Sequence, residues 1–148
     1  NEHGSSVSRL DWNAGKGVLT VAETVPTLPP DLQEKAESGA YRNQCADIHA
    51  TPDARFVYGS NRGHDTLAVF SAEPRTGKLT PVTQVPCGGK EPRNFALVPK
   101  SDLLLCAHQN SDTIAAFRIG KDGVPMPTGA ISKGIPAPVC VIATTAPL

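Results

Sequence analysis

An internal repeat constrains the fold of this chain more than any other feature of its sequence. Residues 65–70, DTLAVF, recur as residues 112–117, DTIAAF, and Pro52 recurs as Pro99 at the same offset of 47 residues. An earlier copy at 17–20, GVLT, precedes its counterpart GKLT at 77–80 by 60 residues. A period in the mid-forties with about four strands per unit is typical of β-propeller blades, and the sequence has almost no helical periodicity.

The repeat therefore predicts an all-β chain, a partial β-propeller of about three four-stranded antiparallel blades. The expected units are a half blade at 1–27, an inserted loop at 28–44, whole blades at 45–87 and 92–132, and one strand of a further blade at 136–144. The strands of the whole blades are expected at 45–51, 55–60, 66–72, 79–87, 92–98, 103–108, 113–119 and 126–132. Inside the inserted loop, only residues 31–37 have a pattern that allows a helical turn or two.

Such a chain is too short to close a ring, because the smallest closed propellers have about four blades. Unpaired terminal strands would expose sheet edges, so the missing blades would come from the rest of a longer chain or from self-association. We favour the longer chain, because the sequence starts abruptly at Asn1-Glu2, where the end of a strand is expected. The first residues carry neither a starting Met nor the basic and apolar regions of a signal peptide, so we expect a cytoplasmic protein.

Composition excludes several classes of function. The 14 basic and 14 acidic residues balance, which gives no footprint for nucleic acid or a membrane surface. The four cysteines have no metal-ligand spacing and are interpreted as buried thiols in a reducing compartment. We therefore expect no metal and no cofactor.

Propeller geometry predicts which polar side chains share a face. Within a blade, the innermost strand begins and the second strand ends at the same end of the sheet, because the two strands are antiparallel. A group of polar residues should therefore gather at one mouth of the central channel and suit a small anionic ligand, since arginine binds carboxylates and phosphates through a planar fork of donors. These residues are Glu2, Asn61, Arg62, His64, Arg93, Asn94 and Gln109.

Each charged candidate also has a structural interpretation. Glu2 could be a solvated turn residue, Arg62 and His64 could cap a tight turn, and Arg93 could pair with Glu91 or Asp47. For several other polar residues, the sequence favours a structural role over a functional one. Asp65 and Asp112 are interpreted as turn formers, His49 as a hydrogen-bonded core histidine and His3 as a solvated tip, whereas His108 stays open.

Four strings make the chain resemble a known family. SNRGHDT at 60–66, GGKEPRNF at 88–95, QNSDT at 109–113 and PAPVCV at 136–141 resemble the lactonase-type propellers, and Asn1-Glu2 resembles a strand end of that family. The family includes propeller-type 6-phosphogluconolactonases and fungal carboxymuconate-lactonizing enzymes. The resemblance covers nearly the whole chain as a C-terminal portion, and it implies a seven-bladed ring and a lactone substrate that bears an acidic group.

The resemblance also implies roles for particular residues. Glu2 and Arg62 match a Glu and an Arg of the lactonizing branch, whose other His and Arg belong to earlier blades that this chain lacks. We therefore expect a lactonase that hydrolyses a sugar lactone such as 6-phosphogluconolactone, with activity in the full-length protein rather than in this portion. Glu2 would act as base, Arg62 would stabilise an oxyanion or carboxylate, and Arg93 and His64 would hold the acidic group. The alternatives are a muconate-cyclising enzyme and a non-catalytic platform for protein binding.

Overall fold

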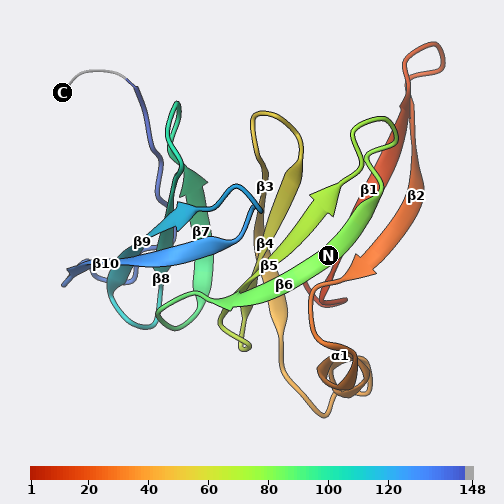
Figure 1. The fold of residues 1–148 in the computed structure, drawn as a ribbon. Helices are drawn as coiled ribbons and strands as arrows, with labels where there is room; N and C mark the ends of the chain where they lie inside the picture. Colours follow the sequence, from red (N-terminus) through yellow and green to blue (C-terminus); the bar gives the residue numbers. More distant parts are fainter. Residues whose placement is uncertain (146–148) are drawn as a thin grey trace.

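Residues 1–145 are described by a computed structural model that contains three antiparallel sheets and one helix (Figure 1). The first sheet is a hairpin of β1 (Ser6–Asn13) and β2 (Val18–Pro26). The second has the order β3-β4-β5-β6 and the third the order β10-β9-β8-β7. Their strands are β3 (Gln44–Ala50), β4 (Phe56–Arg62), β5 (Thr66–Ala72), β6 (Leu79–Pro86), β7 (Pro92–Leu97), β8 (Leu103–His108), β9 (Thr113–Ile119) and β10 (Pro125–Lys133). This is the expected partial β-propeller.

The eight strands of the two whole blades lie within two residues of their predicted positions. Tight turns separate them, and the chain places glycine or a tolerant residue where the backbone turns left-handed. Gly77 has a φ of +67° in the β5–β6 turn, and Gly123 has a φ of +79° in the β9–β10 turn, a region that glycine enters without steric cost.

One predicted segment agrees with the structure in detail and another differs from it. Within residues 28–44, the expected inserted loop, α1 (Pro30–Glu37) forms the short helix that the pattern of residues 31–37 allowed, with proline in its first turn and Asp31 near its positive end. Residues 136–144 form no strand among the described residues. A strand needs a neighbour to pair with, and in the described part of the chain no strand follows β10 that could pair with these residues.

The main core lies between the two four-stranded sheets. Its fully buried aromatic side chains are Tyr58, Phe95 and Phe117, together with the thiol of Cys106. The Tyr58 hydroxyl donates to the Gly123 carbonyl oxygen at 2.9 Å and so joins the sheets, and burial raises its pKa to about 12. Of the four cysteines, which are all free thiols, Cys87 and Cys106 are buried, Cys45 is half-buried and Cys140 is exposed, so the prediction of buried thiols is wrong for Cys140.

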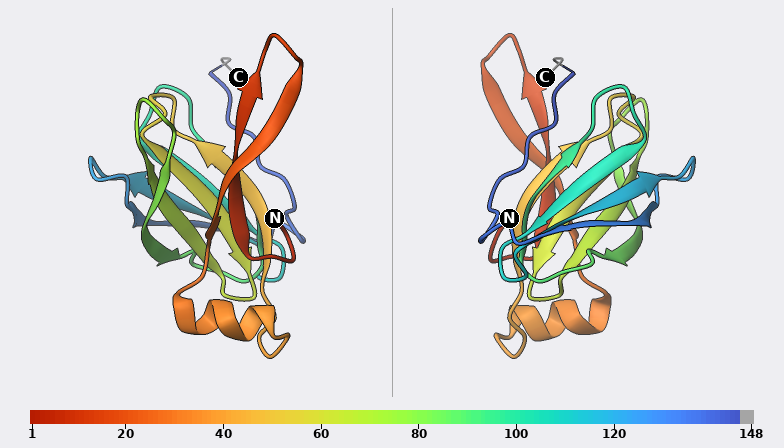
Figure 2. Two further views of the ribbon diagram at one scale, coloured as in Figure 1. Left: turned by 90° about the vertical axis from the view of Figure 1, so that its right-hand side faces the viewer. Right: turned by 90° about the vertical axis from the view of Figure 1, so that its left-hand side faces the viewer.

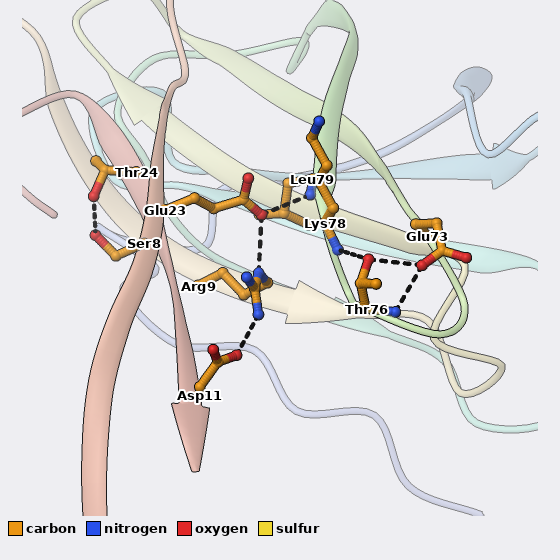
Figure 3. A network of polar contacts seen from close by, with 9 residues as sticks. All are labelled: Ser8, Arg9, Asp11, Glu23, Thr24, Glu73, Thr76, Lys78 and Leu79. Carbon is orange, nitrogen blue, oxygen red and sulfur yellow. Dashed lines mark hydrogen bonds and ion pairs between the residues drawn. The ribbon is translucent and has the colours of Figure 1, made fainter.

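The β1–β2 hairpin packs on the second sheet through a smaller core and a polar network. Val7 contacts the buried cluster around Phe70. Glu23 on β2 accepts from the Arg9 Nε at 3.0 Å and from the Leu79 backbone N–H at 2.8 Å, so one carboxylate ties the hairpin to β6 (Figure 3).

Contacts between neighbouring blades recur with the sequence repeat. The Asp47 carboxylate accepts from the Phe95 backbone N–H at 3.0 Å, and Asn94, the equivalent residue one blade later, accepts from the Val141 N–H at 2.6 Å. Asp65 and Asp112, both at positive φ, accept in the same way from backbone N–H groups of the following segment. Their interpretation as structural turn formers agrees with these contacts.

We expect Asp47→Ala to lower the free energy of unfolding by about 2 kcal/mol, because the buried Phe95 N–H would lose its acceptor. Asp47 also accepts from the Asn94 side chain at 2.6 Å. Asp47→Asn is the matched control and should cost less, since asparagine already fills the equivalent place in the next blade. Urea unfolding measures both, and equal midpoints for the alanine variant and the unchanged protein would contradict the assignment.

The helix α1 lies beyond one end of the sheets, and the tip of the β1–β2 hairpin points toward the other end (Figure 2). The α1 end is where β3 begins and β4 ends. Within residues 1–145, no helix is both long and apolar enough to cross a membrane.

Candidate active site

The strand ends that were predicted to share a face do so. Gln44 at the start of β3 pairs with Arg62 at the end of β4, and Pro92 at the start of β7 pairs with His108 at the end of β8. The Cys45 N–H donates to the Glu2 carbonyl oxygen at 3.0 Å, which brings the N-terminal segment to this end. Antiparallel pairing therefore gathers residues from three blade units at one end of the sheets.

Glu2 and Arg62 form the centre of the site. The Arg62 Nη2 donates to the Glu2 Oε1 at 2.5 Å, and the same nitrogen donates to the Cys45 carbonyl oxygen at 3.2 Å. The Arg62 side chain is only 8 % exposed, whereas that of Glu2 is 52 % exposed. The Arg62 Nε is buried and has no hydrogen-bond partner in the described part of the chain. A buried guanidinium with a free donor is a costly arrangement, and such arrangements cluster at functional sites.

The surroundings keep Glu2 ionised. The hydrogen bond from Arg62 lowers the pKa of Glu2 below its ordinary value, and the positive charges of Arg62, His3 and Arg93 act in the same direction. Desolvation opposes these effects and is outweighed. Glu2 is therefore a carboxylate at neutral pH and would become protonated only in acid, which leaves it able to accept a proton.

Arg93 is the second guanidinium of the site and, unlike that of Arg62, it is exposed. Its Nη1 lies 3.5 Å from the Gln109 Oε1, at the long limit of a hydrogen bond. No ion pair joins Arg93 to Glu91 or Asp47 among residues 1–145, so the structural alternative for Arg93 is not realised there. Its charge remains available to a ligand that approaches Glu2.

Two predicted ligand-binding residues are corrected by the structure. Asn61 is fully buried, and its amide bonds to Thr27 and Asn43 and to the Thr66 hydroxyl. Both ends of the Asn94 amide are also used, in the contacts with Asp47 and Val141. The prediction located the strand ends correctly, but side chains alternate along a strand, and these two point into blade interfaces rather than toward a ligand.

The two histidines at strand ends also serve the fold. His64 is half-buried, its Nδ1 lies 2.8 Å from the Thr66 hydroxyl, and burial lowers its pKa although Asp65 and Asp31 oppose the shift. His108 is fully buried. Its Nε2 must donate to the Cys87 carbonyl oxygen at 2.7 Å, which leaves Nδ1 to accept from Thr113. No hydrogen bond or ion pair joins His64 to Glu2, Arg62 or Arg93 within residues 1–145, so its proposed role remains a prediction.

The sequence interpretation missed neighbours of Glu2. His3, expected as a solvated tip, is close enough to lower the pKa of Glu2, and its Nδ1 lies 3.5 Å from the Gln44 Nε2. The Arg42 Nη2 donates to the Gln44 Oε1 at 3.4 Å. The pairing of the strand start with the strand end would have pointed to Gln44, because it lies directly opposite Arg62.

A groove of about 680 Å³ lies at the opposite end of the blades. It is lined by His49, Phe56, Leu97 and Ile142 among others, and of the predicted site residues Asn94 alone lines it. Apolar side chains dominate it, and it holds none of the charges around Glu2. Within residues 1–145, no three His, Cys, Asp or Glu side chains converge as a metal site.

Comparison with known proteins places this arrangement in a family. The family described as "Lactonase, 7-bladed beta-propeller" matches residues 1–143. The chain belongs to this family. A 6-phosphogluconolactonase of Bacillus subtilis is 30 % identical over 140 residues, which are 95 % of this chain and 38 % of that protein. The chain thus spans a little over a third of that relative.

Solved structures of lactonases resemble the chain over most of its length. A putative 6-phosphogluconolactonase of Bacteroides fragilis is 29 % identical and superposes with a TM-score of 0.80 over 95 % of this chain and 36 % of its own. A periplasmic gluconolactonase of Pseudomonas aeruginosa is 28 % identical, with a TM-score of 0.81 over 93 % of this chain and 36 % of its own. The names of these relatives differ in the lactone, and one of them gives a periplasmic location.

Proposed function

We propose that the protein containing this chain hydrolyses a sugar lactone, such as 6-phosphogluconolactone, to the open acid. The observation that carries the proposal is the contact between the ionised Glu2 and the buried Arg62, with Arg93 beside them. The names of the relatives from Bacillus subtilis and Bacteroides fragilis support the same substrate. The cytoplasmic location stays a prediction, since one relative is described as periplasmic.

In the proposed reaction, the three charged residues Glu2, Arg62 and Arg93 each have one role. A water molecule attacks the lactone carbonyl carbon while the Glu2 carboxylate accepts one of its protons. Negative charge develops on the carbonyl oxygen, and the positive charge of the Arg62 guanidinium stabilises it. The ring C–O bond then breaks, and the proton held by Glu2 passes to the departing ring oxygen. Arg93 holds the acidic group of the substrate, with His64 as the second expected partner, and Gln109 beside Arg93 orients it.

We expect Arg93→Ala to raise KM for 6-phosphogluconolactone by about tenfold, which corresponds to about 1.4 kcal/mol of lost binding. The exposed guanidinium contributes to binding rather than to the chemical step, so kcat should change little. Steady-state hydrolysis by the full-length protein measures both constants, at a pH where spontaneous opening is slow. Arg118→Ala is the matched control, because Arg118 pairs with Asp102 at the far end of β9.

The outcomes of that assay separate the alternatives. An unchanged KM in the Arg93 variant would remove Arg93 from the site. Turnover of a carboxymuconate-type acid, without opening of any lactone, would favour the cyclising reaction. Absence of turnover with both substrates would favour a non-catalytic platform.

A further inference from the structure

A buried asparagine directly before β3 contacts three segments of the chain. Asn43 is only 6 % exposed. Its Nδ2 donates to the Ser5 hydroxyl at 2.9 Å and to the Asn61 Oδ1 at 3.2 Å. Its Oδ1 accepts from the His64 backbone N–H at 3.2 Å. Asn43 therefore joins the N-terminal segment, the end of β4 and the β4–β5 turn.

The directions of the two amides in this contact are fixed by groups that have only one role. The His64 backbone N–H can only donate, so it faces the Asn43 Oδ1 and leaves the Nδ2 to donate. The Thr27 carbonyl oxygen can only accept, so the Asn61 Nδ2 faces it at 3.2 Å and the Asn61 Oδ1 accepts from Asn43. The two buried amides are thus joined by a hydrogen bond of defined direction.

The two side chains that accept from this asparagine are close in sequence to the residues of the Glu2–Arg62 pair. Ser5 lies three residues after Glu2, and Asn61 directly precedes Arg62 on β4. The Glu2 carbonyl oxygen also accepts from the Cys45 N–H at 3.0 Å. The segment that carries Glu2 is therefore attached twice to the start of β3, through the backbone of Glu2 and through the side chain of Ser5.

Other contacts preserve the fold of this end without the Asn43 amide. Asn61 keeps its hydrogen bonds with Thr27 and with the Thr66 hydroxyl, and the Ser5 carbonyl oxygen keeps the Thr27 N–H at 2.8 Å. The Ser5 hydroxyl, in contrast, has no other hydrogen bond within residues 1–145. Removal of the amide should therefore leave the protein folded and loosen the segment that carries Glu2.

The two members of the pair differ in how firmly they are held. The Arg62 side chain is 8 % exposed, and its Nη2 donates to the Cys45 carbonyl oxygen at 3.2 Å as well as to Glu2. The Glu2 side chain is 52 % exposed, and its carboxylate has no hydrogen bond except that from Arg62 in the described part of the chain. The position of the carboxylate therefore depends on the position of its own backbone.

We propose that Asn43 is a positioning residue, which acts through Ser5 and Asn61 to hold the Glu2 carboxylate against the Arg62 guanidinium. It acts through these neighbours and has no direct contact with the reacting atoms. The expected effect on turnover rests on the proposed lactonase function of the Glu2–Arg62 site, whereas the expected effect on the carboxylate itself does not.

The first test is the pH dependence of 6-phosphogluconolactone hydrolysis by the full-length protein. Asn43→Ala should lower kcat about tenfold and leave KM nearly unchanged, because a small displacement of a catalytic group costs at least as much. Glu2 accepts a proton only as a carboxylate, so kcat is lost as pH falls through its pKa. A weaker hydrogen bond from Arg62 raises that pKa, although the charges of His3 and Arg93 still lower it, so the acidic limb of the profile should move to higher pH.

Tyr58→Phe is the matched control for a loss of stability. It removes another buried hydrogen bond of the same strand, from the Tyr58 hydroxyl to the Gly123 carbonyl oxygen at 2.9 Å, far from the end that holds Glu2. It should leave kcat and the pH profile unchanged. Ser5→Ala removes the link from its other side and keeps the remaining contacts of Asn43, so it should act in the same direction as Asn43→Ala and serves if that variant does not fold.

A titration of Glu2 separates failure of this inference from failure of the proposed function. In the full-length protein with ¹³C-labelled glutamate, the Glu2 resonance is assigned by its loss in Glu2→Gln, and its pKa should be higher in Asn43→Ala than in the unchanged protein. A higher pKa without turnover by either protein would support the positioning role and refute the lactonase. An unchanged Glu2 pKa in Asn43→Ala and Ser5→Ala would overturn the positioning role, even with a lower kcat, because the loss would then be structural.

Discussion

Glu2→Gln in the full-length protein is expected to lower kcat for 6-phosphogluconolactone by about 100-fold, with KM nearly unchanged. The amide keeps the shape of the carboxylate and can still accept the hydrogen bond from Arg62, but it cannot take a proton from water. Removal of a general base costs about 10²–10⁴ in rate. We expect the lower end of that range, because Arg62 lowers the pKa of Glu2 and makes it a weak base.

The control for this variant is another carboxylate with a lowered pKa. Glu73 lies in the β5–β6 turn, where hydrogen bonds from Thr76 and Arg75 lower its pKa. Glu73→Gln should leave kcat unchanged. Circular dichroism of the Glu2→Gln variant should match that of the unchanged protein, and an unaltered kcat in it would remove Glu2 from the mechanism.

Phe95→Ala is expected to produce the largest loss of stability, about 3–5 kcal/mol. Phe95 is fully buried on the innermost strand of its blade, packs in the main core and meets the His49 ring edge-on at 4.9 Å between centroids. Truncation leaves a cavity between two blades as well as lost apolar contact. The measurement is the urea midpoint, taken with the slope of the unfolding curve.

Val82→Ala serves as its control. Val82 is 44 % exposed on β6, so its truncation should change the free energy of unfolding by less than about 1 kcal/mol. A loss of under about 1 kcal/mol for Phe95→Ala would contradict the assignment of the core to the space between these sheets.

The repeat made the fold predictable, because DTLAVF and DTIAAF define the third strand of each blade and fix the others by turn spacing. The short helix α1 lies outside the repeat, and it was indicated instead by the local pattern of residues 31–37 after two prolines. The repeat could not reveal that residues 136–144 form no strand. Strand propensity is a local property of the sequence, whereas a strand also needs a neighbouring strand to pair with.

The candidate site was predictable only in its location. Strand ends indicated where Glu2, Arg62 and Arg93 gather, but they carried no information on which way an amide points. Asn61 and Asn94 were therefore assigned to a ligand although they join blades. Gln44 lies at a strand start that the repeat places at this end, but its contact with His3 depends on side-chain directions that only the folded chain shows.

The opening of 6-phosphogluconolactone by the full-length protein, followed beside the Glu2→Gln variant, tests the central claim most directly. We expect a rate well above spontaneous hydrolysis, formation of 6-phosphogluconate as the product, and a loss of about 100-fold in the variant. A rate equal to spontaneous opening, or equal rates for the two proteins, would contradict it.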